Sequence, residues 1–499
     1  MATDNSTFIP NRKALSSEFS YTPKPSSVNG KTFRVSVPSS NATAFTPGQT
    51  MIFNIPMGRA NCVIDPGATY IRYTIRSTTV TAANTATSSF ITGSITPTTT
   101  AVSTSVSNAY GAGLFLDHNA YSPFNTSTLY SGSNQLEYIN GCNILYTYIL
   151  DTNFSYSNAI SSSLNYGMWV PESNPVDIRK GQLLSNVAGG TASATNLTTF
   201  INEQNTYCVP LLSGILGIGS SGKMIPAYAI NDVLRLEILL ENQAQAFCQL
   251  GDFTITPSYS IINASLQLQY IELAPEGMSL VNATAPRGSS MFIVGNSWRH
   301  YVQTIKSGTQ GIFSCLVPSK LASLKNLIIL PRPNSTINNS KAYSLSSRVN
   351  PYFDYIQLKV SGASIPQTPI YLQNASTTGG YAEGLTCLEQ TLGSLLATDK
   401  AGLLFNTNYN VAPAANTTTG VYIAKTDNQS YQNAFALAID TELFGSKDTI
   451  INGLNCLAES MYFEANLGTA APEDYTLDFF ASFDNLFIID QTGYVSSRA

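Results

Sequence analysis

Two histidines are the residues best suited to acid–base chemistry or metal binding in this chain, because imidazole titrates near neutral pH. His300 lies in SWRHYVQT, beside Trp298, on a stretch with the alternation of a strand, and His118 follows Asp117 in a predicted loop. Neither has a nucleophile motif beside it, and they are far apart in the sequence, which disfavours a shared metal site. We therefore predict a structural or interface role for His300, and no catalytic residue and no metal ligand in the chain.

A glycine-rich stretch, SGILGIGSSGK, has some of the spacing of a phosphate-binding loop. That motif requires Ser or Thr directly after its lysine, whereas Met224 follows Lys223 here. The flanks have the pattern of strands, so no helix N-terminus is expected to face a phosphate. We predict turn glycines in a β domain and no bound cofactor. The glycines are Gly214, Gly217, Gly219 and Gly222.

Acidic residues gather most closely at the start of a predicted strand, where Glu473 and Asp474 precede Asp478. We predict that they form a solvated strand edge rather than an acid–base pair. Since no paired nucleophile and base stands elsewhere in the sequence, the chain is not expected to be an enzyme.

Charge is scarce: 11% of the 499 residues are charged, against about 25% in an average soluble domain. The remaining surface is therefore neutral and polar, which suits close packing against other copies because few charges need to be desolvated. The net charge of −5 argues against a dedicated nucleic-acid binder, which normally has a basic face. No run reaches the ~18 apolar residues of a membrane span, and the N-terminal residues lack the apolar core of a signal peptide.

Cysteines stand singly in the sequence, with no CxxC pair and an odd count of seven. Buried free thiols in a reducing compartment explain this pattern better than a disulfide framework does. The cysteines are Cys62, Cys142, Cys208, Cys248, Cys315, Cys387 and Cys456.

The elements that must position these residues are mainly strands. Along Ala68–Ser77, Asp232–Leu240 and Ser265–Leu273, apolar residues alternate with polar ones, which is the period of a strand lying on a core. Val209–Ile218 is also predicted as a strand. Leu136–Leu150 instead has apolar residues every three to four positions and is predicted as a helix. The first half therefore consists of strands with one helix in the middle.

The second half repeats this order. Strands are predicted at Ser297–Ile305, Leu324–Pro333 and Tyr475–Ile489, and Glu383–Leu396 has leucines at helical spacing. Between the halves, Pro275–Gly288 contains two prolines and two glycines and is predicted to be an irregular linker. Because the order of strands, helix and strands occurs twice, the sequence predicts an internal duplication of architecture.

Length supports a division into two domains, because 499 residues exceed what one hydrophobic core usually supports. We predict an N-terminal arm at 1–45, a first β domain at 46–275, a linker at 276–288 and a second β domain at 289–499. The arm is expected to be a tail in the free protein or to become ordered on assembly. Within the first domain, the uncharged Thr78–Asn108 is predicted to be a loop tip on the outer surface.

Four stretches carry a further signal through their order and spacing. They are Ile55–Ile75 (IPMGRANCVIDPGATYIRYTI), Leu129–Asp151, Cys208–Asn242 and Ser297–Pro318. Together they resemble the double jelly-roll major capsid proteins of tailless double-stranded DNA viruses, specifically the Polinton and adintovirus-like branch, with virophages as more distant relatives. The resemblance covers about residues 45–490.

The resemblance implies an all-β fold of two tandem eight-stranded antiparallel jelly-roll sandwiches, with short inserted helices. It implies a homotrimeric capsomer of pseudo-hexagonal outline in an icosahedral capsid. The partners would be neighbouring capsomers, penton proteins and minor capsid proteins, with no sequence-specific nucleic acid and with contact to an internal membrane left open. The location would be the virion, assembled in the cytoplasm or nucleus of the host cell. No catalytic residue or cofactor comes with the resemblance.

Two other classes of protein fit parts of the sequence. A secreted β-sandwich lectin or adhesin is favoured by the Tyr, Asn and Thr content, but the missing signal peptide and the unpaired cysteines disfavour it. A β-rich hydrolase is disfavoured by the missing nucleophile–base pair.

Overall fold

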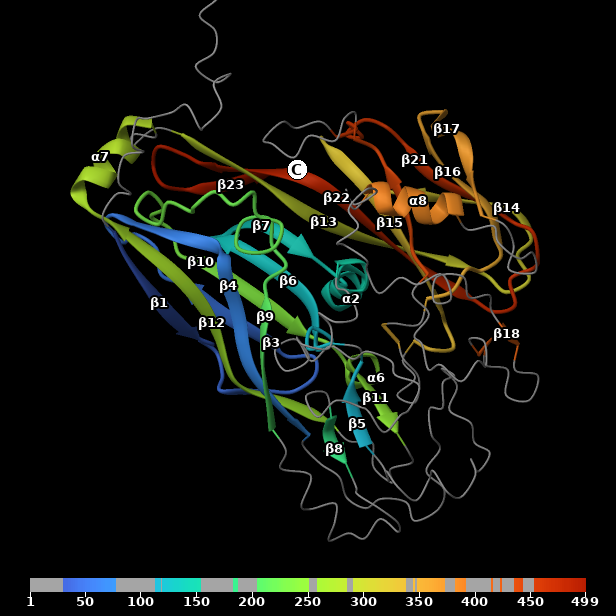
Figure 1. Cartoon of the computed structure of the whole chain (residues 1–499), viewed down its shortest axis with the longest axis horizontal. Helices are drawn as coiled ribbons and strands as arrows, with labels where there is room; N and C mark the ends of the chain where they lie inside the picture. Colours follow the sequence, from blue (N-terminus) through green and yellow to red (C-terminus); the bar gives the residue numbers. More distant parts are fainter. Residues whose placement is uncertain are drawn as a thin grey trace, which may run out of the picture.

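The computed structural model describes residues 30–77, 113–117, 119–153, 183–186, 204–250, 258–284, 290–337, 344–345, 348–372, 382–391, 414–415, 422–423, 435–442 and 453–499. Thr78–Asn108 and His118 lie outside these ranges, so the predictions about them stay predictions. Figure 1 shows the described elements as two β lobes side by side. Within the described ranges, none of the helices has the length and apolar character needed to cross a bilayer.

Eight strands of the first half form two antiparallel sheets. They are β1 (Gly30–Pro38), β3 (Thr50–Ile55), β4 (Cys62–Ser77), β6 (Phe124–Ser131), β7 (Asn134–Ile139), β9 (Gln204–Pro210), β10 (Leu234–Leu240) and β12 (Tyr259–Leu273). One sheet has the order β1-β12-β4-β9 and the other the order β3-β10-β6-β7. The short strand β2 (Ala44–Phe45) also pairs with β12.

Eight strands of the second half form another two antiparallel sheets. They are β13 (Met291–Ile305), β14 (Gly311–Val317), β15 (Leu324–Pro333), β16 (Phe353–Val360), β17 (Ala363–Tyr371), β20 (Leu437–Asp440), β21 (Met461–Leu467) and β22 (Tyr475–Ile489). Their orders are β13-β22-β15-β20 and β14-β21-β16-β17. The C-terminal strand β23 (Val495–Arg498) pairs with β22.

Both halves have the same connectivity. When the eight strands of each half are counted in chain order, the first, eighth, third and sixth form one sheet, and the second, seventh, fourth and fifth form the other. This is the connectivity of a jelly roll, so we call the halves the first roll and the second roll. The predicted fold class, two tandem eight-stranded antiparallel jelly rolls, is confirmed, and so is the predicted duplication.

Side-chain periodicity explains why these residues form these strands. In β10, Leu234, Leu236 and Ile238 are buried while Arg235 and Glu237 between them are half-exposed, as expected for a strand with one face on a core. The helix of each roll also falls at the same place, between its fifth and sixth strands. These two helices are α2 (Cys142–Asn153) and α8 (Ala382–Thr391), and the described residues also include α6 (Gln243–Ala246) and α7 (Pro275–Thr284).

Strand β22 departs from this alternation, because almost all of its residues are buried. Phe479 packs on Phe463 of the opposite sheet of the second roll, with ring centroids 5.3 Å apart. The next residue, Phe480, instead faces the first roll: a Cβ placed on Gly141 would lie 3.3 Å from its ring. The strand is therefore covered on both faces, which explains its nearly continuous apolar sequence.

Two predicted elements have different boundaries in the structure. The helix predicted at Leu136–Leu150 is wrong over its first part, because β7 continues to Ile139 and α2 begins only at Cys142. Gly141 separates them in a left-handed conformation with φ of 65°, which a helix interior does not adopt. The strand predicted at Val209–Ile218 ends at Pro210, and the residues after it form a loop.

Two segments predicted to be irregular have regular structure. Gly30–Pro38, within the predicted arm, forms β1 and pairs with β12 along its whole length. Most of the predicted irregular linker forms α7, because Pro275 stands at the helix start, where its missing N–H costs nothing, and Glu276 lies in the first turn. Met278 of α7 packs in a small apolar cluster that anchors the helix to the first roll.

Three connections of the first roll meet in a further small sheet. It has the order β11-β5-β8, from β5 (Gly113–Leu116), β8 (Leu183–Asn186) and β11 (Phe247–Leu250). These strands lie between the third and fourth, fifth and sixth, and seventh and eighth strands of the roll. Figure 1 shows this sheet at the end opposite to α7. In the second roll, β18 (Ala414–Ala415) and β19 (Tyr422–Ile423) form a pair between the fifth and sixth strands.

Candidate functional site

The two rolls meet at a buried junction formed by β7, the loop after β9 and the first half of β13. At its centre, the buried carboxylate of Glu137 accepts hydrogen bonds from Ser213 Oγ (2.6 Å), Gly214 N (2.8 Å) and Ser297 Oγ. Ser297 belongs to the second roll and the other residues to the first. Burial raises the pKa of Glu137, although the three hydrogen bonds act in the opposite direction. One buried carboxylate thus joins the two rolls.

Glycines allow the two backbones to approach closely at this junction. Gly219 O accepts a hydrogen bond of 2.7 Å from Asn296 N. A Cβ on Gly219 would lie 2.0 Å from Asn296 O, and a Cβ on Gly295 would lie 1.7 Å from Gly214 O, so a side chain is excluded at both positions. The predicted role as turn glycines fits Gly222, which has φ of 78°. Gly214 and Gly219 serve the contact between the rolls, whereas a Cβ on Gly217 would lie 1.9 Å from Leu211 O of the same roll.

Asp478 in β22 is buried, so the predicted solvated edge is wrong for this residue. Its carboxylate accepts a hydrogen bond from Arg332 Nε (2.6 Å) and is hydrogen-bonded to His300 Nε2 (2.8 Å). Burial by itself would raise the pKa of Asp478, but the Arg332 charge and the two hydrogen bonds lower it. Because β22 is covered on both faces, a charged side chain is buried there whichever face it lies on, and it needs partners. His300 also stacks on Phe480, which places it in a structural contact.

A second set of polar contacts joins the α2 side of the first roll to the segment after β15. Asp117 accepts hydrogen bonds from the backbone N–H groups of Ser344 (2.6 Å) and Leu345 (2.9 Å). Arg348, a fully buried arginine, donates to the carboxylate of Asp151 in α2. Buried ion pairs add little net stability, but removing one partner leaves an uncompensated charge. These contacts therefore specify the position of the rolls relative to each other.

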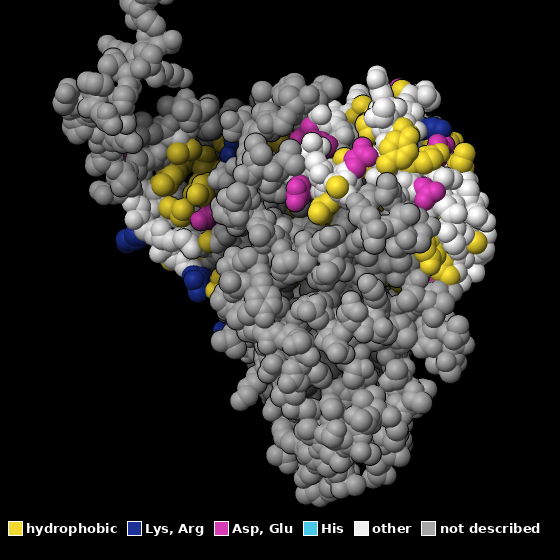
Figure 2. All heavy atoms as spheres, turned by 45° about the vertical axis from the view of Figure 1, so that its right-hand side comes forward, with side chains coloured by type: hydrophobic (Ala, Val, Ile, Leu, Met, Phe, Trp, Pro, Cys, Tyr) yellow, Lys and Arg dark blue, Asp and Glu magenta, His cyan; other side chains and the backbone are white. Residues whose placement is uncertain are grey.

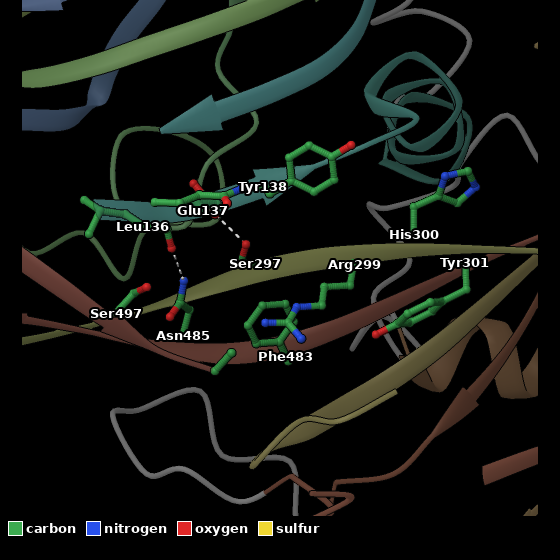
Figure 3. A pocket seen from close by; sticks show the side chains of 12 residues that line it. Leu136, Glu137, Tyr138, Ser297, Arg299, His300, Tyr301, Phe483, Asn485 and Ser497 are labelled. Carbon is green, nitrogen blue, oxygen red and sulfur yellow. Dashed lines mark hydrogen bonds between the residues drawn. The ribbon is translucent and has the colours of Figure 1, made fainter. Parts of the chain in front are cut away.

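An open cavity of about 440 Å³ lies beside Glu137, between β7 and the strands β13, β22 and β23. Figure 3 shows the Arg299 guanidinium over the Phe483 ring, 5.4 Å from its centroid. Ser297 and His300 both line the cavity, but they do not form a nucleophile–base pair. Ser297 Oγ donates to Glu137, and His300 Nε2 is hydrogen-bonded to Asp478 instead.

The other residues singled out in the sequence also have structural contacts. Glu473 accepts a hydrogen bond from Ser335 N (3.2 Å), and burial raises its pKa. Asp474 is bonded to Lys306 Nζ (2.8 Å) in an exposed turn, and this hydrogen bond lowers its pKa. Every cysteine whose side chain is described is a free thiol. The described residues include no group of three or more His, Cys, Asp or Glu side chains that could hold a metal ion.

Sequence reasoning missed the acidic residues that join the rolls. Glu137 falls within the helix predicted at Leu136–Leu150, and that prediction gives it no role. Its position gave one usable signal: a single charge lies between Leu136 and the apolar residues Tyr138 and Ile139 of a short strand. A charge inside an apolar run indicates a buried, paired group. Its partners at 213, 214 and 297 could not be predicted, because they are distant in sequence.

No protein-family model and no curated protein sequence matches this chain. Solved structures do match along nearly its whole length. One is a chain of the PBCV-1 virus capsid, with a TM-score of 0.55, 10% identity and coverage of 96% of this chain and 98% of that chain. The Faustovirus major capsid protein matches with a TM-score of 0.55 and 12% identity, covering 95% of this chain and 92% of that one.

The mavirus major capsid protein matches as well, with a TM-score of 0.51 and 10% identity, covering 100% of this chain and 95% of that one. These matches and the duplicated connectivity define the fold as a double jelly roll. The predicted resemblance to double jelly-roll major capsid proteins is confirmed at the level of the fold.

Proposed function

We propose that this chain is the major capsid protein of an icosahedral virus, a structural subunit without catalytic activity. The observation that carries the proposal is the pair of rolls with identical connectivity, held side by side by buried hydrogen bonds from Ser297 to Glu137 and from the backbone of Ser344 and Leu345 to Asp117. A rigid block of two equivalent lobes is suited to tile a shell. The proteins that share this fold include chains named as viral capsid proteins.

The two rolls have the same orientation, because the first strand of each begins at the same end of the molecule. Helix α7 joins the end of β12 to the start of β13, and Gly30 at the start of β1 pairs with Leu273 at the end of β12. The first strand of each roll therefore begins at the α7 end. The small sheet of inserted connections lies at the opposite end (Figure 1). We place the insertion end on the outside of the shell, which agrees with the outer position predicted for Thr78–Asn108.

Three copies would form the capsomer. Three chains of 53.6 kDa make a particle of about 161 kDa, and closed threefold symmetry places six similar rolls around one axis. Such a trimer has a pseudo-hexagonal outline. Its contacts require little desolvation, because most of the described surface in Figure 2 is neutral or apolar, with few charged side chains.

The remaining assignments follow from the capsid role. We propose a first roll that ends at 275 and, because β1 is its first strand, begins at Gly30 rather than at the predicted 46, so the arm is shorter than predicted. The linker at 276–288 and the second roll at 289–499 complete the proposed division. The partners are neighbouring capsomers, penton proteins and minor capsid proteins, and the location is the virion after assembly in the host cell. No sequence-specific nucleic-acid contact and no cofactor is part of the proposal.

Light scattering coupled to size exclusion tests the trimer. The purified chain at micromolar concentration should have a mass of about 161 kDa, and negative-stain images should show pseudo-hexagonal particles. A stable monomer with no larger species would contradict the capsid assignment. Isolated monomers would favour a different β-sandwich function, such as the lectin or adhesin.

A further inference from the structure

The same outer face is covered in the second roll and open in the first. In the second roll, the first roll lies against the outer face of β22, where a Cβ on Gly141 would lie 3.3 Å from the ring of Phe480. In the first roll, the corresponding face belongs to the sheet β1-β12-β4-β9, and Arg72 and Arg76 of β4 are exposed on it. Figure 1 shows β1 and β12 on the side of the first roll that points away from the second roll.

Arg76 stands in the first roll where Arg332 stands in the second. The eighth strands, β12 and β22, begin at the buried Tyr259 and Tyr475, and each tyrosine pairs with the last residue of the third strand of its roll. Arg76 and Arg332 each lie one residue before that last residue. Because side chains alternate between the two faces of a strand and the tyrosines point into the cores, both arginines lie on the outer face.

Within the chain, Arg332 faces an acidic residue of the first roll. Glu241 follows β10 and is buried. Burial raises the pKa of Glu241, whereas its hydrogen bonds and the positive charge of Arg332 lower it, so the two charges lie within electrostatic range. The side chain of Arg76, by contrast, is exposed and has neither a hydrogen bond nor an ion pair to any described residue.

The second roll has a carboxylate at the place that corresponds to Glu241. In both rolls, the pairing of the fourth strand with the seventh shifts register once, just before Leu240 in the first roll and just before Leu467 in the second. The next residues, Glu241 and Gly468, therefore correspond. Gly468 has no side chain, but a Cβ on it would clash with the carboxylate of Asp354. The Asp354 carboxylate thus fills the space that a side chain at 468 would take.

Asp354 is half-buried and has no basic partner in the part of the chain that the structure describes. Its side chain accepts a hydrogen bond from Asn466 Nδ2 (3.4 Å). Partial burial raises its pKa, as expected for a carboxylate without a neighbouring positive charge. A carboxylate of the second roll and an arginine of the first roll, at the two places that meet within the chain, thus both lack an opposite charge.

Threefold symmetry brings these two places together. When six rolls stand around one axis, each second roll meets the first roll of the next copy in a packing similar to that of the two rolls within one chain. The relation of Glu241 to Arg332 within the chain is then repeated between Asp354 and an arginine of the next copy. Rotation about this axis also keeps the insertion ends of all copies on the same side, as the proposed function requires.

We propose that Asp354 of one chain pairs with the partner's Arg76, and that three such pairs close the trimer. Arginine is suited to this contact, because its planar guanidinium binds a carboxylate through two parallel hydrogen bonds and is less strongly hydrated than an ammonium group. Arg72 lies four residues before Arg76 on the same face and adds positive charge there.

A second copy fits the open face better than the viral genome does. The strands of β1-β12-β4-β9 run between the α7 end and the insertion end, so in the shell their outer face points sideways to a neighbouring roll and not to the interior. The next copy also supplies both the matching packing and the opposite charge. The inference rests on the proposed capsid function and names the contact that closes its trimer.

Charge reversal tests the pair. Arg76→Glu places two carboxylates opposite each other at all three contacts, and Asp354→Arg places two guanidinium groups there. Each should need at least about tenfold more protein than wild type to form the particle of about 161 kDa, measured by light scattering over a dilution series. The combined swap restores opposite charges and should form trimers within about threefold of the wild-type concentration.

Two further sets of variants control for effects on folding. Arg235→Glu makes the same charge change on the other sheet of the first roll, where the side chain is 41% exposed, and should form trimers as wild type does. Arg76→Gln and Asp354→Asn keep the approximate shape of each side chain. Because both remove the same pair, the double neutral variant should weaken the trimer no more than either single change. Circular dichroism checks that every variant keeps its β structure.

The outcomes separate this inference from the proposed function. If the single reversals form trimers as readily as Arg235→Glu does, the pair is wrong while the trimer stands. If they weaken the trimer but the swap does not restore it, or if the losses of the neutral variants add, Arg76 and Asp354 contact other groups, which also overturns the pair. If wild type forms no trimer at any concentration, the proposed function fails and the contact fails with it.

Discussion

Replacing Glu137 should loosen the junction between the rolls. Glu137→Ala leaves one backbone N–H, from Gly214, and two hydroxyls, from Ser213 and Ser297, without their acceptor in a buried site. An unsatisfied buried donor costs about 1–3 kcal/mol, and only the hydroxyls can rotate to other acceptors. We expect a loss of about 3–5 kcal/mol in the free energy of unfolding. Glu137→Gln keeps the volume and one acceptor oxygen and should cost about 1 kcal/mol.

Fluorescence of Trp298, which is buried beside Ser297, reports on this junction. The experiment is a denaturant titration in a Trp169→Phe background, with selective excitation of tryptophan, so that Trp298 is the only tryptophan observed. Glu464→Gln is the matched control. Its carboxylate pairs with Lys359 (2.6 Å) on the outer face of the second roll, and such a partly exposed pair contributes about 0–1 kcal/mol. A Glu137→Ala loss no larger than that of the control would refute the reasoning.

The pH dependence of the same variants provides a further check. Because burial raises the pKa of folded Glu137 above its ordinary value of 4.5, the protonated group favours the folded state at low pH. That contribution is lost as the pH rises through the raised value. The difference in free energy of unfolding between wild type and Glu137→Gln should therefore become smaller as the pH rises from 4.5 through the raised pKa. A difference that widens would contradict the raised pKa.

Three more outcomes are expected. Asp478→Asn leaves the buried Arg332 charge unpaired and should cost about 3–5 kcal/mol in the free energy of unfolding. Because the pKa of folded Asp478 is lowered, wild type should melt at a higher temperature than the variant above pH 3.8, and this difference should disappear as the pH falls through the lowered pKa. Gly295→Ala pushes the rolls apart and should cost about 3 kcal/mol in denaturant titration, whereas Gly308→Ala, with φ of 81° but open space around it, should cost only about 1–2 kcal/mol; equal losses would speak against the close approach. Strong reductant should change neither particle mass nor melting temperature, because free thiols do not constrain the unfolded chain, and a drop of many degrees would revive the secreted alternative.

Local periodicity in the sequence determined the elements whose environment is simple. Strand β10 has one face on a core, so Leu234, Leu236 and Ile238 recur every second residue and identify it. The leucines near α8 recur at helical spacing for the same reason. Because both halves contain such elements in the same order, the duplication could be predicted, whereas the jelly-roll class was predicted from the resemblance to capsid proteins.

Segments in contact with both rolls could not be predicted in this way. Burial on two faces removes the alternation from β22, so the sequence did not distinguish a buried Asp478 from a solvated one. The apolar residues of β7 and α2 together have the spacing of one helix, so the sequence did not show where the strand ends and the helix begins. The boundary is Gly141, whose left-handed conformation is visible only in the structure. In α7, local helix signals at Pro275 and Glu276 and the apolar anchor at Met278 outweighed the glycines and prolines that indicated a loop.

The contacts that unite the chain were decided by tertiary structure alone. Glu137 and Ser297 are distant in sequence, and a hydrogen bond between such residues leaves no periodic signal in either segment. The same holds for the edges of the sheets, because an edge strand has the same sequence pattern as any other strand. The connection between β1 and β3 covers the edge strand β3 through Ser40 and Asn41, and nothing in the sequence of β3 itself indicates this. Sequence therefore determined which residues form strands, and only the packing of one roll on the other decided which of them meet.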